Sequence, residues 1–424
     1  MTACAAILIG TPAFAAEAPL PSTTAEAAGF SADRLARIDA FFSREIAAKR
    51  VPGAVVGIAR DGKLVYLKAF GVRDPSNGAP MQIDSIFGLA SMTKPMVAVG
   101  ALALTEQGKL PLFSKLETYF PSVAEMKVGV PAADGTLTLE KQARPITIQD
   151  LMRHTSGLTY GGRADGGSPV SAQWPSGNVL HRMETSAVFM DTISKLPLAY
   201  QPGTTWEYSE SFDALAAVLD KVTNGKLSDY LRQTIWQPLG MNDTGFHLDA
   251  AMRDRAAHPF ANDPLTGKPQ HIPAVEEDTK FECGGGCSLG TVPDYLRFGQ
   301  MLLNGGTLDG TRILSPHTVS LMTSNQLTPS IKNNVAKVEP HRDGYGFGLG
   351  VAVRVAPGLA AVPGSVGEYS WNGANGTGYF ADPREGLLVV YGTAAPGDLR
   401  KYYREQVQDL VYGAMITSRA AETP

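Results

Sequence analysis

The sequence predicts a mixed α/β fold of the α+β type, in which an antiparallel sheet flanked by helices is interrupted by an inserted all-helical domain. Strand patterns occur before residue 90 and return after residue 340, whereas the segment between them contains mainly helical patterns bounded by Gly, Pro or Asn. The simplest arrangement of these patterns is one sheet built from both ends of the chain.

The elements follow this order along the chain. Residues 31–49 have a serine cap and helical apolar spacing, and the strand patterns GAVVGIAR and KLVYLKAFGV flank Asp61-Gly62, a strong hairpin signal. Helical patterns include TIQDLMRHTSGL, SFDALAAVLDKVT, LSDYLRQTIWQPLG and VPDYLRFGQMLLNGG, and strands return in YGFGLGVAVRV, EYSWNGA, TGYFADP and GLLVVYGTAA before a last helix in LRKYYREQVQDLVYGAM. We therefore expect a discontinuous sheet domain, residues 21–90 and 341–424, and a mainly helical domain, residues 91–340.

Composition narrows the class of protein. The 424 residues are 44% hydrophobic, enough for a full core, and the net charge of −4 comes without a Lys/Arg cluster, which argues against a nucleic-acid partner. Residues 1–20 contain a short apolar stretch followed by Ala-Phe-Ala-Ala, which resembles a secretory signal that lacks its charged n-region. No later stretch is long and apolar enough to span a membrane. These features predict a periplasmic or secreted protein, with its oligomeric state undetermined.

The cysteines and histidines indicate a disulfide more than a metal. Cys4 would be removed with the signal, while Cys283 and Cys287 are separated by three glycines, a spacer flexible enough for a short loop disulfide in an oxidising compartment. The seven histidines lack ligand spacing, and no dinucleotide-binding Gly-x-Gly-x-x-Gly is present. We therefore expect no metal and no cofactor, and leave open that both thiols are free.

The stretch FGLASMTKPMVAVGALALTEQG, residues 87–108, is the first candidate for chemistry. Its apolar run, ended by Gly108, predicts a buried helix that begins near Ser91, because Pro95 is tolerated only in a first turn. Ser91 and Lys94 then lie on one face, one turn apart. A lysine in an apolar helix loses hydration, so its neutral amine becomes accessible to activate the serine. The pattern is short, however, and serine is also a good N-cap.

Four stretches together identify a family. They are Ser91-Met92-Thr93-Lys94, RHTSGL, QPGTTWEYSES and EYSWNGANGTGYFADP, with helices between them and strands at both ends. In this order they resemble the serine β-lactamase and penicillin-binding-protein superfamily, most closely its class C-like esterases, the family VIII carboxylesterases. The resemblance covers nearly the whole mature chain and implies a β-lactamase-like fold. No Gly-x-Ser-x-Gly elbow is present, which disfavours His-dependent hydrolysis, and His154 in RHTSGL is interpreted as structural.

The resemblance implies roles for individual residues. Ser91 would be the nucleophile that forms an acyl-enzyme, Lys94 its proton acceptor, and Tyr208 the relay partner at the place of the family's Tyr-x-Asn motif. The N–H groups of Ser91 and Ala374 would form the oxyanion hole. Taken alone, Tyr208 could instead be a loop tyrosine that packs at a domain junction.

The third motif of the resemblance is Trp371-Asn372-Gly373, on a strand that would line the cleft and contact substrate. Gly373 would allow close approach of the substrate, although a core tryptophan is the ordinary interpretation of Trp371. Lactamases carry lysine at the place of Trp371 and asparagine at the place of Glu210, so this chain would lack the cation that holds a β-lactam carboxylate and would place a carboxylate nearby. Both departures favour neutral esters.

The expected function is therefore a serine hydrolase that cleaves carboxylic esters of short acyl chains, with a small-molecule ester as substrate. A β-lactamase, a D-Ala-D-Ala carboxypeptidase and an acyltransferase are alternatives on the same site. A non-catalytic binding module is a further alternative, which the joint presence of Ser91, Lys94 and Tyr208 disfavours.

Overall fold

The computed structural model describes residues 19–419 apart from residues 133, 135, 163–167, 177–179, 181–184 and 277–279. The signal-like segment predicted at residues 1–20 therefore falls almost entirely outside the described residues. Within the described part of the chain, no helix has the length and apolar character needed to cross a membrane.

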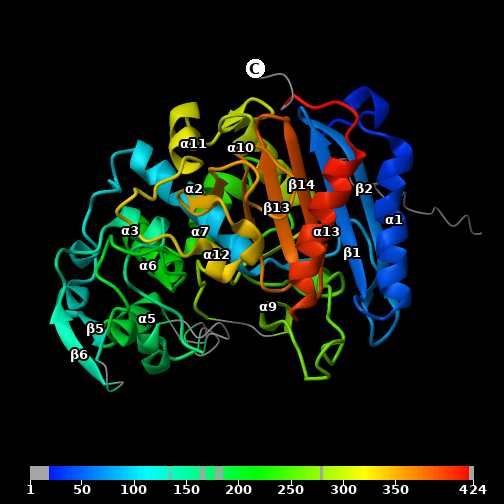
Figure 1. The fold of residues 1–424 in the computed structure, drawn as a ribbon. Coiled ribbons are helices and arrows are strands. Elements are labelled where there is room, and N and C mark those ends of the chain that lie inside the picture. The colour runs from blue at the N-terminus through cyan, green and yellow to red at the C-terminus, as the bar shows by residue number, and fades with distance from the viewer. Residues whose placement is uncertain are drawn as a thin grey trace, which may run out of the picture.

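The centre of the fold is an eight-stranded sheet built from both ends of the chain, as predicted (Figure 1). Its strand order is β10-β11-β12-β13-β14-β1-β2-β3, and every neighbouring pair is antiparallel. The two ends of the chain meet where β1 pairs with β14, with Val56 opposite Tyr391. The strands are β1 (Gly53–Arg60), β2 (Lys63–Asp74), β3 (Ala79–Pro80), β10 (Tyr345–Phe347), β11 (Ala352–Arg354), β12 (Tyr369–Asn372), β13 (Thr377–Asp382) and β14 (Leu387–Thr393).

The predicted hairpin between β1 and β2 turns at Asp61 and Gly62, which have φ values of 52° and 74°. Positive φ at both central residues is the requirement of a type I′ turn, whose twist matches that of the flanking strands. The Asp-Gly pair therefore fixes the register of the first two strands.

Helices cover both faces of this sheet. Figure 1 shows α1 (Ala32–Ala47) and α13 (Leu399–Ala414) side by side on one face, where they enclose an apolar cluster that includes Phe41, Phe42 and Tyr403. The other face is covered by α10 (Val292–Leu303), which packs on β1, β13 and β14. α10 belongs to residues 91–340, the segment predicted to be mainly helical, so part of that segment packs directly on the sheet.

The remaining elements form the mainly helical part. Its central helix is α2 (Thr93–Glu106), whose residues are all buried from Thr93 to Leu104, as expected for a helix that is apolar on every side. Around it lie α3 (Ile148–Met152), α5 (Ser186–Ile193), α6 (Ser211–Thr223), α7 (Leu227–Leu231), α8 (Ala250–Arg253), α9 (Pro273–Glu276), α11 (Pro316–Met322) and α12 (Val335–Val338), with short single turns between them. Three two-stranded pairs were not predicted: β4 (Phe87–Gly88) with β7 (Leu289–Gly290), β5 (Lys127–Pro131) with β6 (Leu137–Lys141), and β8 (Thr307–Leu308) with β9 (Thr311–Arg312).

A buried carboxylate organises the chain around α3. Asp150 is fully buried, completes a capping box with Thr147, and accepts hydrogen bonds from Arg144 at 2.6 and 2.9 Å, Arg153 at 3.0 Å and Thr155 at 2.8 Å. Burial alone would raise the pKa of Asp150, but the hydrogen bonds from Arg144 and Thr147 outweigh it and lower that pKa to about 2. The ionised carboxylate therefore stabilises the native state.

We expect Asp150→Asn to lower the free energy of unfolding by about 2–3 kcal/mol at neutral pH, because a carboxyl whose pKa is depressed by nearly two units stabilises the fold above its unfolded pKa. The difference from wild type should shrink as the pH falls from about 4 towards about 2, where the native carboxyl becomes protonated. Urea unfolding at several pH values measures both effects.

The matched control is Asp191→Asn, which removes an exposed carboxylate paired with Lys195 at 2.7 Å. We expect it to change the free energy of unfolding by less than about 0.5 kcal/mol, since exposed ion pairs contribute little. Equal effects of the two substitutions would contradict the role given to Asp150.

Candidate active site

Ser91 lies in a strained turn that leads into the central helix. The turn spans Ala90–Met92, and α2 begins at Thr93, two residues later than the serine. Ala90 has a φ of 47°, a left-handed conformation that costs a non-glycine residue about 1 kcal/mol. Strain of this kind persists only where the surrounding structure enforces it, and it is often found at functional sites. Pro95 falls in the first turn of α2, as the sequence predicted.

The structure brings Ser91, Lys94 and Tyr208 together. The Lys94 Nζ donates to the Ser91 Oγ at 3.2 Å, and the Tyr208 hydroxyl donates to the same oxygen at 2.6 Å. The Lys94 Nζ also lies 4.6 Å from the centre of the Tyr208 ring. One serine oxygen is therefore within proton-transfer distance of both an amine and a phenol, the arrangement that activates a nucleophilic serine.

Lys94 is fully buried, and two further groups bind its amine. The Gly285 carbonyl accepts a hydrogen bond from the Lys94 Nζ at 2.5 Å, and the Tyr160 hydroxyl lies 3.4 Å from it. Neither residue was predicted from the sequence. Tyr160 follows the RHTSGL stretch by two residues, so its position beside a recognised motif was the available signal.

An aromatic cage fixes the Tyr208 ring. Trp206 stacks on it with an interplanar angle of 18°, His154 lies 4.8 Å away, and the Trp371 Nε1 donates to the Tyr208 hydroxyl at 3.3 Å. His154 is itself fully buried and shares a hydrogen bond of 3.2 Å with Ser209. This placement beneath the tyrosine agrees with the structural role expected for His154.

The turn after β12 supplies the second proposed oxyanion donor. Thr377 donates to the Leu89 carbonyl at 3.0 Å, which holds this turn against the chain just before Ser91. A Cβ on Gly373 would lie 2.3 Å from the Leu89 carbonyl oxygen. Only glycine therefore allows the turn to approach the Leu89 backbone this closely. Ala374 is exposed, and no hydrogen bond within the described residues uses its N–H.

Arg404 fixes the orientation of the Gly373–Ala374 peptide from the side of the sheet that α13 covers. It lies on α13 and donates to the Gly373 carbonyl at 2.8 Å, while its other nitrogen is held by Glu339 at 2.5 and 2.7 Å. Burial alone would raise the pKa of Glu339, but the charge of Arg404 and its neighbours keeps that pKa below its ordinary range. Because the peptide is trans, the Ala374 N–H points away from the Gly373 carbonyl and from Arg404.

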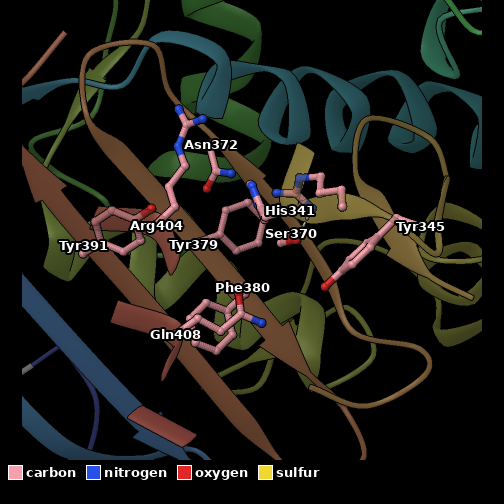
Figure 2. A pocket seen from close by; sticks show the side chains of 10 residues that line it. His341, Tyr345, Ser370, Asn372, Tyr379, Phe380, Tyr391, Arg404 and Gln408 are labelled. Carbon is pink, nitrogen blue, oxygen red and sulfur yellow. Dashed lines mark hydrogen bonds between the residues drawn. The ribbon is translucent and has the colours of Figure 1, made fainter. Parts of the chain in front are cut away.

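Three predicted substrate contacts are placed differently. Glu210 is fully buried at the start of α6, so its carboxylate does not line the cleft as expected. Asn372 lies on the opposite face of β12 from Trp371 and lines a small cavity with Ser370 and Arg404 (Figure 2). Adjacent residues of a strand point to opposite faces, so Trp371 and Asn372 could not both face the substrate. Trp371 is only 2% exposed and contacts Tyr208, so it is a support for Tyr208 and not an open aromatic wall.

Cys283 and Cys287 form a disulfide, with their Cα atoms 5.2 Å apart. The loop that it closes carries Gly285, the residue whose carbonyl binds Lys94. Within the described residues, no group of three or more His, Cys, Asp or Glu side chains is arranged to hold a metal ion.

Comparison with known proteins agrees with this geometry. A family model described as β-lactamase matches residues 38–411. The chain belongs to the β-lactamase family. Among curated relatives, Protein Rv1367c of Mycobacterium tuberculosis is 35% identical over 80% of this chain and 84% of its own length, and Esterase EstB of Burkholderia gladioli is 30% identical over 85% of this chain and 90% of its own.

Among solved structures, EstCE1, described as a hydrolase with promiscuous acyltransferase activity, has a TM-score of 0.73 and 28% identity. The match covers 90% of this chain and 99% of that chain. The predicted family and the predicted β-lactamase-like fold are thereby confirmed. The family with its esterase and acyltransferase members supports the coarse assignment of a serine-hydrolase type of enzyme.

We expect Arg404→Lys to lower kcat for a chromogenic ester by about 10- to 100-fold with KM little changed, because the substitution loosens a peptide that binds charge in the transition state. Lysine keeps a cation beside Glu339, so the variant should fold. The control is Lys401→Met on the exposed side of the same helix. A wild-type kcat in Arg404→Lys would contradict the role of Arg404.

Proposed function

We propose that this protein hydrolyses carboxylic esters of short acyl chains through an acyl-enzyme on Ser91. The observation that carries the proposal is the pair of contacts to one serine oxygen, from the Tyr208 hydroxyl at 2.6 Å and the Lys94 amine at 3.2 Å. A serine in an ordinary N-cap would hydrogen-bond to the backbone of its helix and would not need two titratable neighbours.

In acylation, the Ser91 Oγ attacks the ester carbonyl and its proton passes to the Lys94–Tyr208 pair. The oxygen of the tetrahedral intermediate accepts hydrogen bonds from the N–H groups of Ser91 and Ala374. Collapse of the intermediate breaks the bond to the alcohol, which takes the proton from the pair. Water then repeats the sequence on the acyl-enzyme, releases the acid and restores Ser91.

The position of Trp371 supports an ester over a β-lactam. In the lactamases that the sequence resembles, a lysine at this place would bind the lactam carboxylate, whereas here the indole N–H donates to Tyr208. A neutral ester needs no such cation. Because Glu210 is buried, its carboxylate gives no further argument against an anionic lactam, and the preference for an ester over a β-lactam rests on Trp371.

Acyl transfer to an alcohol is the second candidate function. EstCE1 is described as a hydrolase with promiscuous acyltransferase activity, and one acyl-enzyme would serve both reactions when an alcohol replaces water. We also propose that the protein is exported, because the Cys283–Cys287 disulfide suits an oxidising compartment.

We expect Ser91→Ala to lower kcat for a nitrophenyl ester by about 10⁴- to 10⁶-fold, and Tyr208→Phe to lower it by at least about 10²-fold, because both groups act on the transferred proton. The matched control is Tyr160→Phe, which removes a hydroxyl 3.4 Å from the Lys94 amine and should cost less than about 10-fold. Stopped-flow and steady-state kinetics measure these effects. A Tyr208→Phe variant with wild-type kcat would refute the relay.

We expect kcat/KM for a short nitrophenyl ester to exceed that for the cephalosporin nitrocefin by at least about 100-fold, or roughly 2.7 kcal/mol of transition-state preference. A panel of esters of increasing acyl length, run beside nitrocefin, measures this ratio and the chain-length limit. Adding an alcohol acceptor and quantifying the new ester separates transfer from hydrolysis. Comparable efficiency on ester and lactam would favour the lactamase alternative.

A further inference from the structure

The loop closed by the Cys283–Cys287 disulfide is in direct contact with the catalytic amine. Its middle residue, Gly285, accepts the hydrogen bond of 2.5 Å from the Lys94 Nζ, which is the shortest contact that the amine makes in the described part of the chain. The amine is therefore bound both by this loop and by the Ser91 hydroxyl. Any displacement of the Gly285 carbonyl changes the position from which Lys94 reaches the serine.

Two other contacts hold this loop in place, one to α6 and one to the nucleophile helix α2. The Gly285 N–H donates to the buried carboxylate of Asp213 at 2.9 Å, so both the N–H and the carbonyl of this residue are engaged. Just past the disulfide, Ser288 donates from its backbone to the Thr93 Oγ1 at 3.1 Å. The disulfide adds a covalent constraint, because it joins the two cysteines that flank the three glycines.

The glycines explain why the segment needs a cross-link. Glycine loses more conformational freedom on folding than any other residue, so three in succession would hold a carbonyl poorly in place. A disulfide with a sequence separation of only 4 closes a very small loop, and the stabilisation of a whole fold by a disulfide grows with loop length. The cross-link is therefore suited to local geometry more than to global stability.

We propose that the Cys283–Cys287 disulfide is a positioning element for Lys94: it fixes the Gly285 carbonyl that holds the amine beside Ser91. The proposal rests on the proposed function, since it assigns a support to the relay of that reaction. Without the disulfide, the amine keeps its contact to Tyr208 but loses a fixed acceptor at Gly285. We expect substrate binding to be little changed, because both cysteines are buried.

The first experiment compares wild type with the double variant Cys283→Ala/Cys287→Ala, at a temperature well below both melting points. We expect kcat for a nitrophenyl ester to fall by about 10- to 100-fold, with KM within about twofold of wild type, as for a misplaced catalytic group. A role in stability alone would lower the melting temperature and leave kcat unchanged. A wild-type kcat in the folded double variant would overturn the proposal.

Two glycine variants test the carbonyl with the disulfide intact. A Cβ on Gly285 would lie 2.3 Å from the Asp213 Oδ2, whereas the nearest atom to a Cβ on Gly286 is 3.6 Å away. We expect Gly285→Ala to lower kcat by about 10-fold or more, with KM retained, and Gly286→Ala to behave as wild type. Asp213→Asn, which keeps an acceptor for the Gly285 N–H, should retain more activity than Asp213→Ala. Equal kcat values for the two glycine variants would overturn the proposal.

A third measurement does not depend on ester turnover. A phosphine reductant converts the wild-type disulfide to two thiols by supplying two electrons, with two protons from water and formation of the phosphine oxide. Amide hydrogen exchange in residues 283–288 and 91–94 should then become faster, and Ser91 should react more slowly with a fluorophosphonate. Unchanged exchange after complete reduction would overturn the positioning role, whereas an oxidised enzyme whose Ser91 does not react would overturn the proposed function alone.

Discussion

Burial of the Lys94 amine is the constraint on which the rest of the site depends. A fully buried amine at the start of an apolar helix is stable only when its hydrogen-bonding capacity is used by protein groups. In this fold those groups are the Ser91 hydroxyl, the Gly285 carbonyl, the Tyr160 hydroxyl and the Tyr208 ring. They come from segments far apart in sequence, so the site assembles only when the helical part of the chain is folded around α2.

The sheet contributes the other half of the site for a topological reason. Because β1 and β14 pair at its centre, the strands from the end of the chain lie close to the segment that carries the nucleophile. The turn after β12 then reaches Leu89, and Arg404 on the covering helix orients the peptide of that turn. The proposed nucleophile and the proposed second oxyanion donor are thus 283 residues apart in sequence but lie on segments that the Thr377–Leu89 hydrogen bond joins.

Local sequence patterns predicted those features of the structure that depend on residues close together in the sequence. The Asp61-Gly62 turn, the buried helix and the one-turn spacing of Ser91 and Lys94 all follow from short-range rules, and the structure has each of them. The contacts that were missed depend on tertiary placement, as with Gly285, which lies 191 residues beyond Lys94. Strand alternation could have excluded one error in advance, because Trp371 and Asn372 are neighbours and cannot both face a cleft.

Trp371 occupies the position at which the lactamases that this sequence resembles carry a lysine, and the two side chains have different chemistry. A lysine there would present a cation to the substrate, whereas the indole is buried, stacks against Arg342 at 5.1 Å and donates to the Tyr208 hydroxyl. The side chain therefore supports the tyrosine that the proposed mechanism uses as a proton relay. Under the proposed function, a neutral ester would need no cation at this position, whereas a charged lactam would find no lysine there to bind its carboxylate.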